Sequence, residues 1–350
     1  MFSGLTQSAG SALGGSRFSL VSVLPTVVLG GYVTVLVESG AYSGHRASFS
    51  HVVRLVETNP VWAGVIAFGL LLGAILLRPF QVVLVQILEG YWSARGPVGF
   101  AAQLATERHE RRFEKARVMQ SARPLTKRGK TLTMQARHAR AQRKAEAISL
   151  RARSIYDSYP RPDSDDVLHN SRLMPTRLGN LLRDGEDVAG NRYGLDLPAV
   201  EHRLQPVLSA PVRDLITRQL DLLDTLSALC VMFSAAAVAS AVLIIRWDAA
   251  SLAPCVAVLA AVASYRGALR VADEHRVVLA TAVDLHRFDM IKALHYELPK
   301  TAKQEYRFNL RLSGFLGDGR SLASDQMQRH QYEHPAPAAG DGATRPIPPN

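Results

Sequence analysis

Residues 226–245 read LSALCVMFSAAAVASAVLII, and residues 249–265 read AASLAPCVAVLAAVASY. Neither run contains Asp, Glu, Lys, Arg or His. Twenty helical residues cover about 30 Å, which is the thickness of the hydrocarbon core of a bilayer. The two runs therefore predict two membrane-spanning helices joined by the short turn 246–248.

Two further apolar runs lie in the N-terminal half of the chain. Residues 18–37 and 61–77 contain no charged side chain, and Arg78 follows the second run. We expect membrane-spanning helices over 18–37 and 61–78 as well. One alternative is a secretory signal peptide at 18–37, although only one basic residue precedes it and no Ala-x-Ala site ends it. Another is that all four runs are core helices of a soluble protein, but such helices usually keep a polar stripe.

Five residues at the ends of apolar stretches are expected at the membrane–water interface. Trp62, Trp92 and Trp247 stand where an apolar stretch begins or ends. Tryptophan is enriched at headgroup level, and long arginine side chains can reach it from inside the bilayer. Arg78 and Arg266 directly follow apolar runs, so we assign them to the interface too.

The distribution of arginines predicts how the chain is threaded. Only Arg46, Arg54 and Arg246 lie on the side opposite to the termini. Eight arginines lie close to the runs on the side that carries both termini: Arg17, Arg78, Arg95, Arg213, Arg218, Arg266, Arg270 and Arg276. Because basic residues favour the cytoplasmic side, we expect both termini and the long middle loop in the cytoplasm.

The predicted fold class is an all-α membrane protein with four transmembrane helices in two hairpins and a cytoplasmic helical domain. Residues 1–17 form a cytoplasmic N-terminal segment, 79–225 the helical domain and 266–316 a cytoplasmic helical extension. The segment 317–350 is rich in proline and poor in core-forming residues, which predicts a disordered tail. Helical spacing also continues through both C-terminal runs, so we expect each to project into the cytoplasm as one continuous helix.

Residues 107–153, which we call the basic belt, contain 15 Lys and Arg against 4 Asp and Glu. The belt therefore carries the whole formal net charge of +11. It reads as two helices, 97–121 and 130–156, and mixed helices follow at 174–189 and 198–205. Anionic lipid headgroups would attract such a belt by about 1 kcal/mol per basic residue, and a solvated helix face is the other interpretation. Nucleic acid is not favoured, because the belt holds a single aromatic residue for base stacking.

The four runs lack the ionisable side chains that proton and ion pathways usually need. They do contain small residues, including Gly69 and Gly73 in a G-x-x-x-G pattern. Such faces let helices approach closely, either within one chain or between copies in a homo-oligomer.

No motif for catalysis or for a cofactor is present. The chain has no phosphate-binding loop, no G-x-S-x-G, no H-E-x-x-H and no C-x-x-C. Asp284-x-His286-x-x-Asp289 has metal-ligand spacing but lacks a second cluster. We therefore predict no catalytic residue, no cofactor and no metal.

Four short segments resemble recurring signatures of uncharacterised bacterial four-span membrane proteins of unknown function: residues 88–92 (LEGYW), 174–180 (MPTRLGN), 192–196 (RYGLD) and 284–289 (DLHRFD). The resemblance covers about residues 80–312 and implies a bacterial inner-membrane location but no activity. It marks five polar residues as the candidate site for a partner or ligand: Arg177, Asn180, Arg192, Tyr193 and Asp196.

The leading functional hypothesis is a membrane protein whose cytoplasmic helical domain binds an unknown protein partner or organises the membrane face. The alternative is a homo-oligomeric channel or transporter without ionisable residues in the membrane.

Overall fold

The computed structural model describes residues 20–42, 49–77, 81–121, 132–160, 172–245, 249–317 and 332–333. These residues are helical almost throughout, and the described part of the chain holds one isolated β-bridge and no strand. The predicted all-α class is confirmed. The chain divides into two compact units, Met1–Gly185 with Leu215–Arg276 (unit 1) and Glu186–Asp214 with Val277–Asn350 (unit 2).

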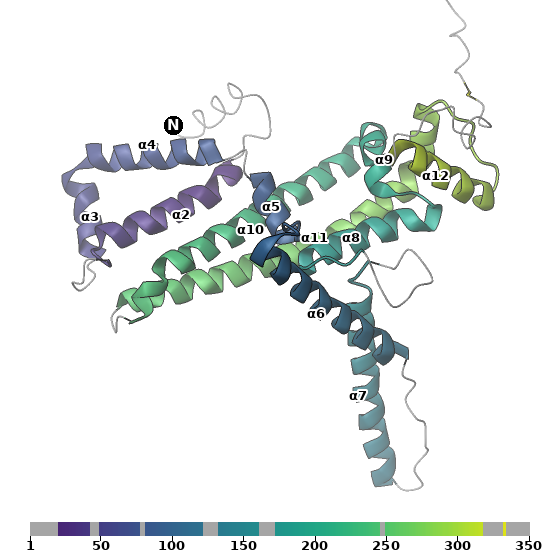
Figure 1. Cartoon of the computed structure of the whole chain (residues 1–350), viewed down its shortest axis with the longest axis horizontal. Coiled ribbons are helices and arrows are strands. Elements are labelled where there is room, and N and C mark those ends of the chain that lie inside the picture. Colours follow the sequence, from purple (N-terminus) through teal and green to yellow (C-terminus); the bar gives the residue numbers. More distant parts are fainter. Residues whose placement is uncertain are drawn as a thin grey trace, which may run out of the picture. The chain divides into compact units, whose positions relative to one another are not determined.

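Unit 1 begins with three helices that pack on one another, α2 (Leu20–Glu38), α3 (Phe49–Thr58) and α4 (Pro60–Leu77) (Figure 1). Helix α3 was not among the helices expected from the sequence. A Cβ atom at Gly30 would clash with the side chain of Leu70, so the absence of a side chain at Gly30 allows α2 and α4 to approach closely.

Two long helices confirm the prediction that helical spacing continues through the C-terminal runs. α10 covers Ala210–Ser240 and continues as the 3₁₀ segment η4 (Ala241–Ile245), and α11 covers Leu252–Ala293 after η5 (Ala249–Ser251). Both helices are long and apolar enough to cross a membrane. The 42 residues of α11 correspond to about 63 Å, twice the hydrocarbon thickness.

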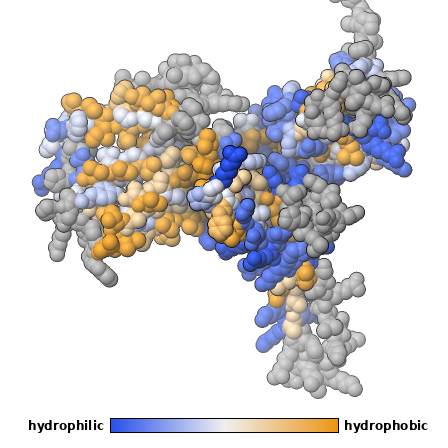
Figure 2. All heavy atoms as spheres, in the orientation of Figure 1, coloured by the Kyte–Doolittle hydropathy of each residue, from blue (hydrophilic) through white to orange (hydrophobic). Residues whose placement is uncertain are grey.

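The apolar helices of unit 1 leave large hydrophobic side chains exposed. In Figure 2 hydrophobic residues cover α2, α4 and the apolar halves of α10 and α11. Val238 in α10 is 77% exposed and Leu259 in α11 is 69% exposed. Only 28% of the most apolar window of each long helix is buried, which is little for core helices of a soluble protein.

The remaining helices of unit 1 are α5 (Gln81–Glu89), α6 (Gly96–Ser121), α7 (Leu132–Tyr156) and the first part of α8 (Arg177–Gly190). α6 and α7 pack together as a helical hairpin, close to the predicted bounds (Figure 1). Residues of α5, α8, α10 and α11 bury a leucine-rich cluster: Leu88, Leu178, Leu181, Leu223, Ala268, Val271 and Ala272.

Unit 2 contains η2 (Asn191–Tyr193), α9 (Leu197–Leu204), η3 (Gln205–Val207) and α12 (Ala302–Gly317), besides the ends of the longer helices. α12 packs on α9 and η2. Its buried face is partly polar, because Glu305, Asn309 and Ser313 follow one another at intervals of four residues.

Several sequence-based expectations lie outside the described residues. These are the segment 1–17, the interface residues Arg78 and Trp247, and the tail 317–350 apart from Gly317, Tyr332 and Glu333. Tyr332 forms the isolated bridge with Tyr296, and the two rings stack with centroids 5.2 Å apart.

The two described tryptophans assigned to the interface differ in exposure. Trp62, near the start of α4, is 54% exposed. Trp92 is half-buried, and its indole N–H donates a 2.6 Å hydrogen bond to the carbonyl of Ile87.

Candidate functional site

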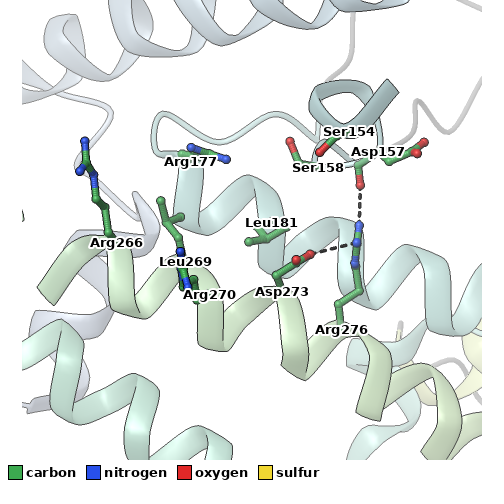
Figure 3. A pocket seen from close by; sticks show the side chains of 10 residues that line it. All are labelled: Ser154, Asp157, Ser158, Arg177, Leu181, Arg266, Leu269, Arg270, Asp273 and Arg276. Atoms are coloured by element: carbon green, nitrogen blue, oxygen red, sulfur yellow. Dashed lines mark hydrogen bonds and ion pairs between the residues drawn. The ribbon is translucent and has the colours of Figure 1, made fainter. Parts of the chain in front are cut away.

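A cavity of about 590 Å³ lies within unit 1, where the end of α7, the start of α8 and the middle of α11 meet (Figure 3). Four arginines line it, and we call it the arginine cavity: Arg177 from α8 and Arg266, Arg270 and Arg276 from α11. Its size is typical of a site for a small molecule or for one headgroup.

The spacing of residues along α11 explains how one helix supplies most of the wall. Residues three or four apart lie on the same face of a helix. Arg266, Leu269, Arg270 and Asp273 follow this spacing and all line the cavity. Opposite them, Figure 3 shows Asp157 and neighbouring serines at the end of α7.

Arg276 holds the cavity wall together. Its guanidinium donates one hydrogen bond of 2.7 Å to a carboxylate oxygen of Asp184 and one of 2.6 Å to the carbonyl oxygen of Asp157. It also forms an ion pair with Asp273 at 2.9 Å. The Asp184 side chain is 2% exposed, so this ion pair is largely removed from water. One arginine thereby joins α7, α8 and α11.

The other three arginines carry uncompensated charge. Among the described residues, Arg177, Arg266 and Arg270 have no hydrogen-bonded or ion-paired partner for their side chains. The two carboxylates of the lining form ion pairs with other arginines: Asp273 with Arg276, and Asp157 with Arg153 at 3.7 Å. The cavity is therefore positively charged.

The charge of Arg177 also acts on a partly buried histidine of α6. His109 of α6 lies 2.8 Å from the hydroxyl of Tyr159 through its Nδ1 atom. Burial lowers the pKa of His109, and the positive charges of Arg112, Arg108 and Arg177 lower it further. Burial raises the pKa of Tyr159, whose side chain packs on Phe113.

The candidate residues Arg177 and Asn180 both belong to unit 1 but have different roles there. Arg177 is exposed and lines the arginine cavity. Asn180 is fully buried, where its amide accepts from the N–H of Met174 at 2.8 Å and donates to the carbonyls of Met174 and Thr176, each at 2.7 Å. Asn180 therefore fixes the turn that leads into α8.

The other three candidates lie together in unit 2. The Tyr193 hydroxyl donates to Asp284 at 2.8 Å, and Arg192 forms a 3.4 Å ion pair with the same carboxylate. Burial and this hydrogen bond raise the pKa of Tyr193, whereas Arg287 lowers it. The backbone N–H of Asp196 donates to Ser313 at 2.9 Å, and its own side chain is exposed.

A buried ion pair supports this part of unit 2. Arg287 donates to Glu305 at 2.6 Å, and both side chains are largely buried. The Arg287 guanidinium also lies 4.1 Å from the ring centroid of Tyr193. Asn309 donates to the Tyr193 carbonyl at 2.9 Å. These contacts attach the segment around Tyr193 to α11 and α12.

The histidine and aspartate with metal-ligand spacing form only a pair. His286 Nδ1 lies 3.1 Å from Asp289, and Nε2 lies 3.4 Å from the backbone nitrogen of Ser209. The described parts of the chain contain no group of three or more His, Cys, Asp or Glu that could hold a metal ion.

Sequence reasoning used Arg266, Arg270 and Arg276 as indicators of threading, assigned Arg266 also to the membrane interface, and did not recognise that the three line one cavity. One local signal was available, because Arg266 and Arg270 are four residues apart and directly follow an apolar run. Asp157 and Asp184 carried no such signal, since only the tertiary packing brings them to Arg276.

The chain matches no protein-family model, and no curated protein and no solved structure shows significant similarity to it.

Proposed function

We propose that this chain is an integral membrane protein whose cytoplasmic helices form a docking or membrane-organising module. The observation that carries the proposal is the large amount of exposed apolar side chain on α4, α10 and α11. Contact of these side chains with water costs roughly 25 cal/mol per Å² of apolar surface, whereas contact with lipid tails carries no such cost. Four apolar runs and the distribution of arginines favour four membrane-spanning helices with both termini in the cytoplasm.

The basic belt supports a role at the membrane face. Exposed basic side chains lie along α6 and α7, among them Arg108, Arg112, Arg143 and Arg151. Large apolar side chains on the same hairpin are also exposed, and Val118 reaches 68% and Leu150 67%. A surface that combines exposed cations with apolar side chains suits anionic headgroups or an acidic protein partner.

Cell fractionation and tag accessibility test this proposal. We expect the full-length protein in the pellet after high-speed centrifugation and carbonate washing, and in solution only after detergent is added. A tag inserted near residue 130 should be protected in intact cells, and one within 43–48 should be reachable from outside. Recovery of the protein in plain buffer, or an externally reachable tag near 130, would contradict the proposal.

A homo-oligomeric channel is a second candidate, and one observation favours it. No described atom outside its own helix lies within 4 Å of a Cβ placed at Gly69 or Gly73, so the described residues leave this small-residue face of α4 uncovered. Open small-residue faces suit contact between copies. If the channel exists, Gly69→Ile with Gly73→Ile should reduce the oligomer mass in detergent and abolish ion flux into liposomes. A wild-type monomer without flux would exclude this candidate.

A further inference from the structure

The arginine cavity combines a defined volume with positive charge that the protein itself does not neutralise. Arg177 comes from α8, and Arg266 and Arg270 come from consecutive turns of α11, yet all three line one space (Figure 3). Like charges gathered in this way repel one another unless an anion is present. Their exposure leaves them solvated when the cavity is empty, so the fold tolerates the arrangement without a ligand.

The chemistry of the lining selects among anions. Guanidinium groups donate two parallel hydrogen bonds to phosphate or carboxylate oxygens, and three arginines provide more donors than one carboxylate can accept. The Ser154 hydroxyl adds a further donor to the lining. Leu181 and Leu269 supply an apolar part of the wall beside the charged groups. A phosphate ester with a small organic portion matches this combination, and a nucleic-acid strand does not fit a cavity of about 590 Å³.

We infer that the arginine cavity binds the phosphate group of a phosphate ester, and that Arg177, Arg266 and Arg270 hold its oxygens. Arg276 acts as a positioning residue, because its contacts with Asp184 and with the Asp157 carbonyl keep the three helices in place around the ligand.

Two sources could supply such a phosphate, an anionic phospholipid headgroup or a soluble phosphate compound. Arg266 directly follows the apolar run 249–265, which places it at headgroup level if that run spans the bilayer. The lipid source thus rests on the proposed membrane location, whereas phosphate binding itself does not.

The experiment uses full-length protein and two probes. Inorganic phosphate is titrated into protein in a zwitterionic detergent at constant ionic strength, and binding is read as a rise in Tm. Phosphatidylglycerol is added in increasing fraction to phosphatidylcholine nanodiscs that hold the protein, and native mass spectrometry counts the molecules retained.

The cavity variant is Arg266→Gln with Arg270→Gln, and the matched control is Lys303→Gln with Arg307→Gln on the exposed surface of α12, outside the basic belt. Both variants lose two positive charges. We expect the cavity variant to weaken binding of the effective probe at least about tenfold, because charge-assisted hydrogen bonds are lost, and the control to change it less than about twofold. Arg177→Gln, on α8, should also weaken binding of the probe. This single variant tests the inference if the double variant does not fold.

Saturable binding of phosphatidylglycerol alone would identify a lipid headgroup, and binding of inorganic phosphate would identify a soluble source. The inference is overturned if neither probe binds saturably to the wild type, or if the control variant weakens binding as much as the cavity variant does. If fractionation shows a soluble protein, the proposed membrane location is wrong. The titration with inorganic phosphate still shows whether the arginine cavity binds phosphate.

Discussion

Arg276 is the residue on which the wall of the arginine cavity depends. It neutralises the buried carboxylate of Asp184 and also satisfies a carbonyl at the end of α7. Removing one partner of a buried ion pair is far more costly than replacing both, because a buried charge then lacks its counter-ion.

Arg276→Met should therefore lower the free energy of unfolding by about 3 kcal/mol. Arg276→Met combined with Asp184→Leu should recover a large part of this loss. Thermal or denaturant unfolding in detergent measures both effects. A double variant at least as unstable as the sum of the single variants would show that the ion pair is not the source of the loss.

His109 makes stability depend on pH. Its pKa is lower in the folded protein than in the unfolded chain, because burial and nearby arginines disfavour the charged ring. Between the folded and unfolded pKa values the unfolded chain binds the extra proton, so stability decreases as the pH falls below about 6.5.

His109→Gln should flatten this decrease, since glutamine keeps a hydrogen-bonding group near Tyr159 but does not titrate. The measurement is Tm between pH 5 and 7.5 for both proteins, so that the other histidines contribute equally. Parallel curves for wild type and variant would refute the assignment.

At the level of the element, α12 is attached through polar contacts that periodicity alone does not reveal. Its buried face binds Arg287 through Glu305, the Tyr193 carbonyl through Asn309, and the Asp196 N–H through Ser313. The adjoining turn fits because Gly194 adopts φ of 74° and lies against the backbone of Tyr306.

Gly194→Ala should lower the free energy of unfolding by roughly 1–3 kcal/mol, since both the positive φ and the close Tyr306 carbonyl oppose a Cβ atom. Gly314→Ala is the matched control inside α12, where no described atom outside its own helix lies within 4 Å of the added Cβ, and it should raise stability by roughly 0.5–1 kcal/mol. Hydrogen exchange of α12 amides provides the local measurement. Equal protection in both variants would argue against a strained turn at Gly194.

Helices with strong local signals could be predicted from the sequence, and their tertiary contacts could not. The breaks at Pro124 and Gly129 and the run of helix-forming residues on each side were enough to locate α6 and α7 within two residues. α3 was missed because it is short and lies between two more hydrophobic runs. Arg177 was singled out, but its partners in the cavity lie about 90 residues away along the chain, and no pattern in the sequence indicates that contact.

At the level of the whole molecule, charge and hydrophobicity are segregated along the chain. Residues 107–153 hold the entire net charge, whereas the apolar helices α4, α10 and α11 expose many large hydrophobic side chains. An exposed thiol in an apolar run offers a direct test of what surrounds it. Cys255 in α11 is exposed and forms no disulfide.

In native membranes a water-soluble maleimide should label Cys255 at least about tenfold more slowly than a cysteine placed by Arg143→Cys on α7, because thiolate formation needs water. Both sites should react when the protein is unfolded in detergent. Mass spectrometry of inside-out vesicles measures the two rates. Equal rates in membranes would mean that Cys255 faces water.

The joining of three separate segments by Arg276 also sets an order of events during synthesis. A ribosome releases α7 and α8 well before α11, which begins about 60 residues after the end of α8. Asp184 therefore leaves the ribosome before Arg276, its counter-ion in α11, has been synthesised. A nascent chain that ends before residue 276 lacks Arg276, so Arg266 and Arg270 would not be held in their places in the cavity wall. We expect quality-control proteases to degrade such truncated chains. Only the chain that includes Arg276 should bind an anion in the cavity.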